Sequence, residues 1–231
     1  MIKEAIEYLQ KTAHAQFVEH DGRTYSTKEL HAVKNPSVDT VQVHTLDGLC
    51  TFIAQLQMQQ GTLQALVKSP SHVCVLGDLE KPWRNRQIYA EAKDFDGGSR
   101  AFQFGNYYDQ AEFIIGLNAW FVKTVDRDNL LKFVSTVTHE NAVGAKDDGV
   151  TQTVTTKSGA KLGVESMPNP VELAPYRSFR EIEQVMSKFL LRYKDGKFAL
   201  FDVEGNAWQY EAVKRVAEYL AGKLAGVSII T

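Results

Sequence analysis

The chain lacks the sequence signatures of the common nucleotide-dependent and hydrolytic enzymes. It contains no P-loop, no dinucleotide-binding GxGxxG, no HExxH and no GxSxG. Its two cysteines, Cys50 and Cys74, form no CxxC pair, which argues against a thiolate zinc site, and we expect both to be reduced and buried in the core. The six histidines are dispersed, without the spacing that places two imidazoles on one helix face. We therefore predict no metal site and no cofactor.

A strong charge of either sign is also missing. Lys and Arg number 26 against 28 Asp and Glu, which gives a formal net charge of -2. This balance excludes a global attraction to nucleic acid or anionic lipid, so any site for a polyanion must be a local patch. The sequence has neither an apolar run of about 18 residues, as a membrane helix needs, nor a signal-peptide pattern at its start. We expect a cytoplasmic protein without a membrane partner.

What the sequence does contain is the composition of an ordinary folded protein, with 44% hydrophobic and 23% charged residues. Amphipathic helical patterns cover residues 2–14, 45–61, 109–121, 126–139 and 206–224. Strand patterns cover residues 73–76, 87–92, 101–104 and 150–156, and two hairpin turns are indicated by Asp21-Gly22 and Asp195-Gly196. Because helices and strands do not alternate regularly, the predicted fold class is α+β, with mainly antiparallel sheets and packed amphipathic helices.

The predicted domain organisation depends on the small, glycine-bearing segment 143–149, which is typical of an exposed loop. It would separate an N-terminal α+β region, residues 1–142, from a C-terminal hairpin-and-helix region, residues 150–231, and we expect the two to pack as one globular unit. The run of β-branched and hydroxylated residues at 150–156 is typical of an edge strand. Such an edge could pair with a second copy, so we expect a homo-oligomer.

Arginine and aromatic residues are interleaved between positions 176 and 192, a mixture that can clamp a phosphate and stack a base. The predicted ligand-binding residues of this segment are Tyr176, Arg177, Phe179, Arg180 and Arg192. The turn containing Trp83 and Arg84 is a second candidate contact. The competing interpretation is structural: Phe179, Ile182 and Phe189 would pack inward while the arginines pair with Glu181 and Glu183.

An acidic arrangement on the two central strand patterns suggests a different chemistry. Asp78 follows the first of these strands, and Glu91 and Lys93 form an ExK on the second. In metal-dependent nucleases such carboxylates hold a divalent cation while the lysine orients the attacking water. Since ExK also recurs by chance in chains of this length, a solvated strand end is the competing interpretation.

Several blocks of the sequence resemble the YfdQ-like family of phage and prophage proteins, a domain of unknown function. The resemblance is carried by Asp147-Asp148-Gly149-Val150-Thr151-Gln152, by Asn169-Pro170-Val171-Glu172-Leu173-Ala174-Pro175-Tyr176-Arg177-Ser178-Phe179 and by Trp208. Ser178 and Val185 depart from the family pattern, where Thr and Pro are expected. The resemblance implies a phage or prophage origin, expression in the cytoplasm of a bacterial host and no established catalytic activity.

These observations lead to three functional hypotheses. The first is a non-enzymatic phage binding protein for counter-defence, which sequesters a nucleotide ligand or blocks a host immune protein. The alternative is an accessory protein of phage DNA transactions that binds single-stranded DNA, and a second alternative is a metal-dependent nuclease using Asp78, Glu91 and Lys93.

Overall fold

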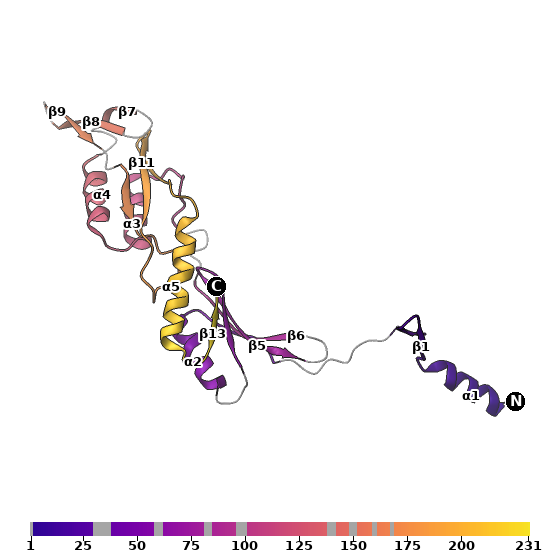
Figure 1. Ribbon diagram of the computed structural model, residues 1–231. Coiled ribbons are helices and arrows are strands. Elements are labelled where there is room, and N and C mark those ends of the chain that lie inside the picture. Colours follow the sequence, from indigo (N-terminus) through magenta and orange to yellow (C-terminus); the bar gives the residue numbers. More distant parts are fainter. Residues whose placement is uncertain are drawn as a thin grey trace. The chain divides into compact units, whose positions relative to one another are not determined.

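A computed structural model describes residues 2–29, 38–57, 62–80, 85–95, 101–137, 142–147, 152–158, 161–166 and 169–231. The fold is α+β, with sheets that are mainly antiparallel, as predicted (Figure 1). The chain forms two compact units, Met1–Ser37 and Val38–Thr231, and the segment 143–149 belongs to the second of them. Among the described residues, no helix combines the length and the apolar composition needed to cross a lipid bilayer.

The N-terminal unit contains one helix and one hairpin. Its elements are α1 (Ile2–Ala13), β1 (Phe17–His20) and β2 (Arg23–Ser26). The hairpin turn uses Asp21 at φ 49° and Gly22 at φ 71°, two positive values that suit the twist of a two-residue hairpin. The predicted turn at this dipeptide is confirmed.

The second unit contains a five-stranded sheet in the order β13-β4-β5-β6-β3. Its strands are β3 (Val41–Val43), β4 (Gln64–Ser69), β5 (His72–Glu80), β6 (Asn85–Lys93) and β13 (Ser228–Ile230). The three central strands are antiparallel to one another, whereas the two edge strands pair in parallel. The segment after Leu76, predicted as a turn, instead continues β5 beyond two irregularities in register.

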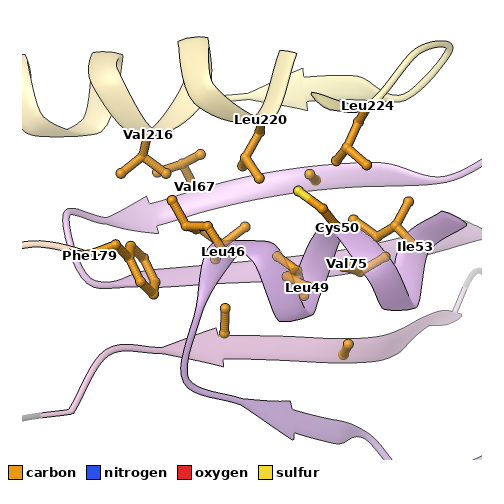
Figure 2. Close-up of a cluster of buried hydrophobic side chains, with 14 of the residues drawn as sticks. Leu46, Leu49, Cys50, Ile53, Val67, Val75, Phe179, Val216, Leu220 and Leu224 are labelled. Carbon is orange, nitrogen blue, oxygen red and sulfur yellow. The ribbon is translucent and has the colours of Figure 1, made fainter. Parts of the chain in front are cut away.

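One face of this sheet is covered by α2 (Leu46–Gln57) and α5 (Ala207–Lys223) (Figure 2). The register aligns Ala65, Val75 and Ala90 on that face, where they are fully buried with the apolar residues of both helices. Because side chains alternate along a strand, the neighbouring aligned residues Leu66, Cys74 and Glu91 belong to the opposite face. The side chains drawn in Figure 2 all belong to the apolar cluster.

A second core lies between two helices and a three-stranded sheet. The elements are α3 (Gln110–Trp120), α4 (Val125–Thr136), β10 (Val171–Leu173), β11 (Ser187–Lys194) and β12 (Lys197–Asp202). β11 and β12 form the predicted hairpin, whose turn has Asp195 at φ 50° and Gly196 at φ 79°. The predicted cap of α3 is confirmed, since the Asp109 carboxylate accepts a hydrogen bond from the backbone N–H of Glu112 at 2.8 Å.

The segment 101–104, predicted as a strand, is irregular. Its two phenylalanines are ordered by ring contacts rather than by a sheet ladder. The Phe102 ring meets those of Tyr108 and Phe121 at centroid distances of 4.9 and 5.2 Å, and the Phe104 ring stacks on Phe189 at 4.9 Å. Aromatic packing therefore replaces the predicted backbone pairing.

A separate antiparallel sheet is formed by β7 (Ala142–Asp147), β8 (Gln152–Ser158) and β9 (Lys161–Ser166). Two predictions are wrong here. The expected loop at 143–149 contains most of β7, and the expected edge strand is the central strand, because β8 pairs on both sides. Backbone pairing satisfies the N–H and C=O groups of β8, so β8 offers no free edge to a second copy.

Candidate functional site

The segment predicted to bind a ligand folds into a tight loop after β10. Its shape is set by Gln184, whose side-chain oxygen accepts the backbone N–H of Arg177 at 3.1 Å and whose amide nitrogen donates to Phe179 O at 2.9 Å. Successive side chains of this loop consequently point in different directions. Phe179 is fully buried in the same core as α2 and α5 (Figure 2), so its assignment as a ligand contact is corrected to a core residue.

The guanidinium of Arg177 is paired with other side chains of the protein. One terminal nitrogen donates to Asp202 Oδ2 at 3.1 Å and the other to Ser187 Oγ at 2.7 Å, while the guanidinium lies 4.1 Å from the ring centre of Trp208. Its side chain is 13% exposed. Burial lowers the pKa of Arg177, and the Asp202 carboxylate acts in the opposite direction. We conclude that this arginine mainly joins β11, β12 and α5, and that its predicted role as an anion clamp is corrected.

Arg180 and Tyr176 keep the arrangement that the sequence predicts for ligand binding. The exposed guanidinium of Arg180 lies 3.7 Å from the ring centre of Tyr176, which is a close cation–π contact. Tyr176 is held beside Trp120, because its backbone N–H donates to Trp120 O at 2.9 Å. Within the described part of the chain, no carboxylate forms an ion pair with Arg180. Its charge is therefore available to an anion.

These two side chains line a recess of about 420 Å³. The rest of its wall comes from the β4–β5 turn, the two residues directly after β6, the irregular segment 101–104 and the end of α3. The lining residues are Ser71, Asp94, Phe95, Ala101, Phe102, Phe104, Trp120, Phe121, Pro175, Tyr176, Arg177 and Arg180. Aromatic rings thus dominate the wall, and its polar side chains are those of Ser71, Asp94, Arg177 and Arg180.

Asp94 gives the recess a carboxyl group whose pKa is raised. Burial raises the pKa of this carboxyl group, while a backbone hydrogen bond from Phe95 and the charge of Arg180 oppose the rise. The neighbouring Phe95 ring is 70% exposed and stacks on His44 at 4.2 Å. The recess therefore presents an aromatic face, a carboxyl group and a guanidinium to one ligand.

The other predicted contacts are Arg192, Trp83 and Arg84. Arg192 lies on β11 opposite Ala199, donates to Leu191 O at 3.1 Å and is not part of the recess wall. Trp83 and Arg84 lie outside the described residues.

The nuclease arrangement is contradicted by the strand register. Glu91 pairs with Cys74, whereas Asp78 lies four positions further along β5, about 13 Å away at the rise of a strand. Two carboxylates that share a divalent cation must each reach to within about 2.5 Å of it. Glu91 and Lys93 do meet, with 3.5 Å between Oε2 and Nζ, but Asp78 does not belong to their cluster.

The partners of Glu91 are instead His72 and Cys74, on the sheet face opposite α2 and α5. The Cys74 thiol donates to Glu91 Oε1 at 3.3 Å, and His72 Nε2 lies 3.4 Å from Cys74 Sγ and 3.5 Å from Glu91 Oε2. Lys68 Nζ and Lys93 Nζ lie 3.6 and 3.5 Å from the same carboxylate. Both cysteines are free and buried, as predicted, but Cys74 is buried among polar groups rather than in the apolar core.

The pKa of Glu91 is set by these neighbouring groups. Burial by itself would raise the pKa of Glu91, but hydrogen bonds from Cys74 and Gln42 and the charges of His72 and Lys68 lower it to about 2. Sequence reasoning missed the cluster because it searched for pairs at helical spacing. The signal was the strand spacing His72-x-Cys74, which places both side chains on one face.

Comparisons of this chain with protein-family models, with curated proteins and with solved structures find no match. The resemblance to the YfdQ-like family stays a prediction.

Proposed function

We propose that the protein is a non-enzymatic binding protein that captures a nucleotide in the recess between Arg180, Tyr176 and Asp94. The observation that carries the proposal is the exposed guanidinium of Arg180, stacked at 3.7 Å on Tyr176 beside an aromatic wall. An anionic group and an aromatic ring on the same small molecule would satisfy both parts of this wall.

The dimensions and chemistry of the recess suit such a ligand. Its volume of about 420 Å³ falls within the range of about 300–1,000 Å³ that is typical of small-molecule sites. A nucleobase can stack against the aromatic wall, as bases do on aromatic platforms. Arg180 can donate to a phosphate, while Asp94 can accept from the N–H groups of the base.

The setting of this activity follows from the family resemblance and is part of the same proposal. In a phage protein, capture of a nucleotide would serve counter-defence by removing a signal of the bacterial immune response. Binding to a host immune protein and binding to single-stranded DNA remain alternative predictions.

The test divides the ligand into its parts. Calorimetric titrations with AMP, adenosine and ribose 5-phosphate should show AMP as the tightest of the three, because only AMP engages the rings and Arg180 together. Arg180→Gln should weaken AMP about 10–100-fold, as expected from the loss of a charge-assisted hydrogen bond, and should leave adenosine nearly unchanged. Tyr176→Ala should weaken AMP and adenosine alike.

Arg192→Gln is the matched control, because Arg192 belongs to the predicted set but does not line the recess. Equal losses in Arg192→Gln and Arg180→Gln would refute the site, and no saturable binding of AMP, cyclic AMP or ADP-ribose would refute the proposal. Retention of an oligonucleotide with a steep salt dependence, without mononucleotide binding, would favour the DNA alternative.

A further inference from the structure

The His72–Cys74–Glu91 cluster has no part in the nucleotide proposal, and its geometry has a chemical meaning of its own. His72 and Cys74 alternate on β5 and therefore share a sheet face, and Glu91 lies directly across from Cys74 on β6. Three different donor atoms, an imidazole nitrogen, a thiol sulfur and a carboxylate oxygen, thus converge with their ligand atoms within 4.8 Å of one another.

We propose that His72, Cys74 and Glu91 form a binding site for a zinc ion on this face of the sheet. The donor spacing supports the assignment. In a tetrahedral zinc site, Zn–S is about 2.3 Å and Zn–N or Zn–O is about 2.1 Å. The sulfur then lies about 3.6 Å from the nitrogen and from the oxygen, and the nitrogen lies about 3.4 Å from the oxygen. The observed separations are 3.4 Å from Cys74 Sγ to His72 Nε2, 3.3 Å from Cys74 Sγ to Glu91 Oε1 and 3.5 Å from His72 Nε2 to the other carboxylate oxygen, Oε2.

The carboxylate bridges the other two donors, with Oε1 toward the Cys74 sulfur and Oε2 toward the His72 nitrogen. Glu91 can therefore coordinate through either oxygen or through both. Sulfur, imidazole and carboxylate together favour zinc over magnesium or calcium, which take oxygen ligands only. Three protein ligands leave the fourth tetrahedral position to water or to an external ligand.

The two lysines do not exclude the ion. Lys68 and Lys93 pair with Glu91, but their side chains are 38% and 54% exposed and can swing into water when zinc replaces them. Coordination converts the Cys74 thiol into a thiolate, and its proton passes to solvent. The thiolate and the Glu91 carboxylate then balance the two charges of the ion, so no net charge is left buried at the site.

The test uses the full chain without an affinity tag, stripped of metal and titrated with Zn²⁺ and with Co²⁺ as a spectroscopic substitute. We expect one ion per chain, and the Co²⁺ protein should show the thiolate-to-cobalt charge-transfer absorption of a tetrahedral site. Cys74→Ala should abolish that absorption and weaken Zn²⁺ about 100-fold, which corresponds to one ligand's share of the binding free energy of a protein zinc site.

Cys50→Ala is the matched control, because Cys50 is the other buried thiol and projects from α2 into the apolar core. It should keep both the stoichiometry and the absorption. His72→Gln, which changes a partly exposed side chain, provides a second variant in case Cys74→Ala perturbs folding, as checked by circular dichroism. Failure to bind Zn²⁺, an affinity for Zn²⁺ that is unchanged in Cys74→Ala and His72→Gln, or a Co²⁺ spectrum without charge transfer would each overturn the assignment.

Discussion

Replacing Arg177 by methionine should reveal whether this arginine holds the interior of the second unit together. Methionine keeps much of the apolar volume but removes both side-chain hydrogen bonds, at 3.1 Å to Asp202 and 2.7 Å to Ser187, and the contact with Trp208. It also leaves Asp202, whose side chain is 20% exposed, without its ion-pair partner.

The expected cost can be worked from these contacts. Breaking a buried ion pair by removing one partner costs about 3–5 kcal/mol. The lower end applies here, because Asp202 Oδ1 still accepts the backbone N–H of Glu204 at 2.9 Å. We therefore expect Arg177→Met to lower the free energy of unfolding by about 3 kcal/mol, or the melting temperature by about 6–12 °C for a chain of this size.

Urea unfolding followed by tryptophan fluorescence measures this loss. Arg180→Gln is the comparison, because its exposed guanidinium should contribute less than about 0.5 kcal/mol to stability. The double variant Arg177→Met, Asp202→Asn should recover part of the loss, since the uncompensated charge is then gone. If the Arg177 and Arg180 variants unfold at the same urea concentration, the interior role of Arg177 is refuted.

Three further outcomes follow from other contacts. Glu181→Ala should lower the free energy of unfolding by about 1 kcal/mol and speed amide exchange in the first turn of α2, because Glu181 Oε1 accepts the backbone N–H of Leu46 at 2.7 Å. Unchanged amide exchange would contradict this capping role. The pKa of Asp47 is lowered from 3.8 chiefly by the hydrogen bond from Tyr219, so the stability it adds is complete above pH 3.8 and lost as the pH falls through the lowered value. Tyr219→Phe should raise this pKa in an NMR titration, and no rise would exclude the cause given. Gly116→Ala should lower the melting temperature and weaken the binding of AMP, because the new Cβ would lie 2.7 Å from the packed Phe102 ring. Helix propensity alone would favour alanine by about 1 kcal/mol, so a more stable variant would contradict this expectation.

Local signals predicted much of the secondary structure. Asp21-Gly22 and Asp195-Gly196 tolerate positive φ within a single dipeptide, so their turns need no distant partner. The caps Thr45 and Asp109 act within one helical turn, and the helices that follow them are where the sequence places them. The short strands β3, β10 and β13 were missed, because three residues carry no periodicity of their own.

The candidate site depended on contacts between residues that are far apart in the sequence. In the sequence, nothing separates the buried from the exposed members of the set Tyr176, Arg177, Phe179 and Arg180. The distinction comes from distant contacts, because Arg177 pairs with Asp202 on β12 and Phe179 packs in the core beneath α2. The structural interpretation was right for Phe179, but Arg177 pairs with Asp202 rather than with a glutamate of its own segment.

The sequence by itself determined which residues alternate on β5, so the common face of His72 and Cys74 follows from the period of a strand. The tertiary structure decided that Glu91, and not Asp78, lies beside them, because the register of β5 against β6 is a property of the pair. The same holds for the recess, whose aromatic wall, carboxyl group and guanidinium come from four separate stretches of chain that packing alone brings together.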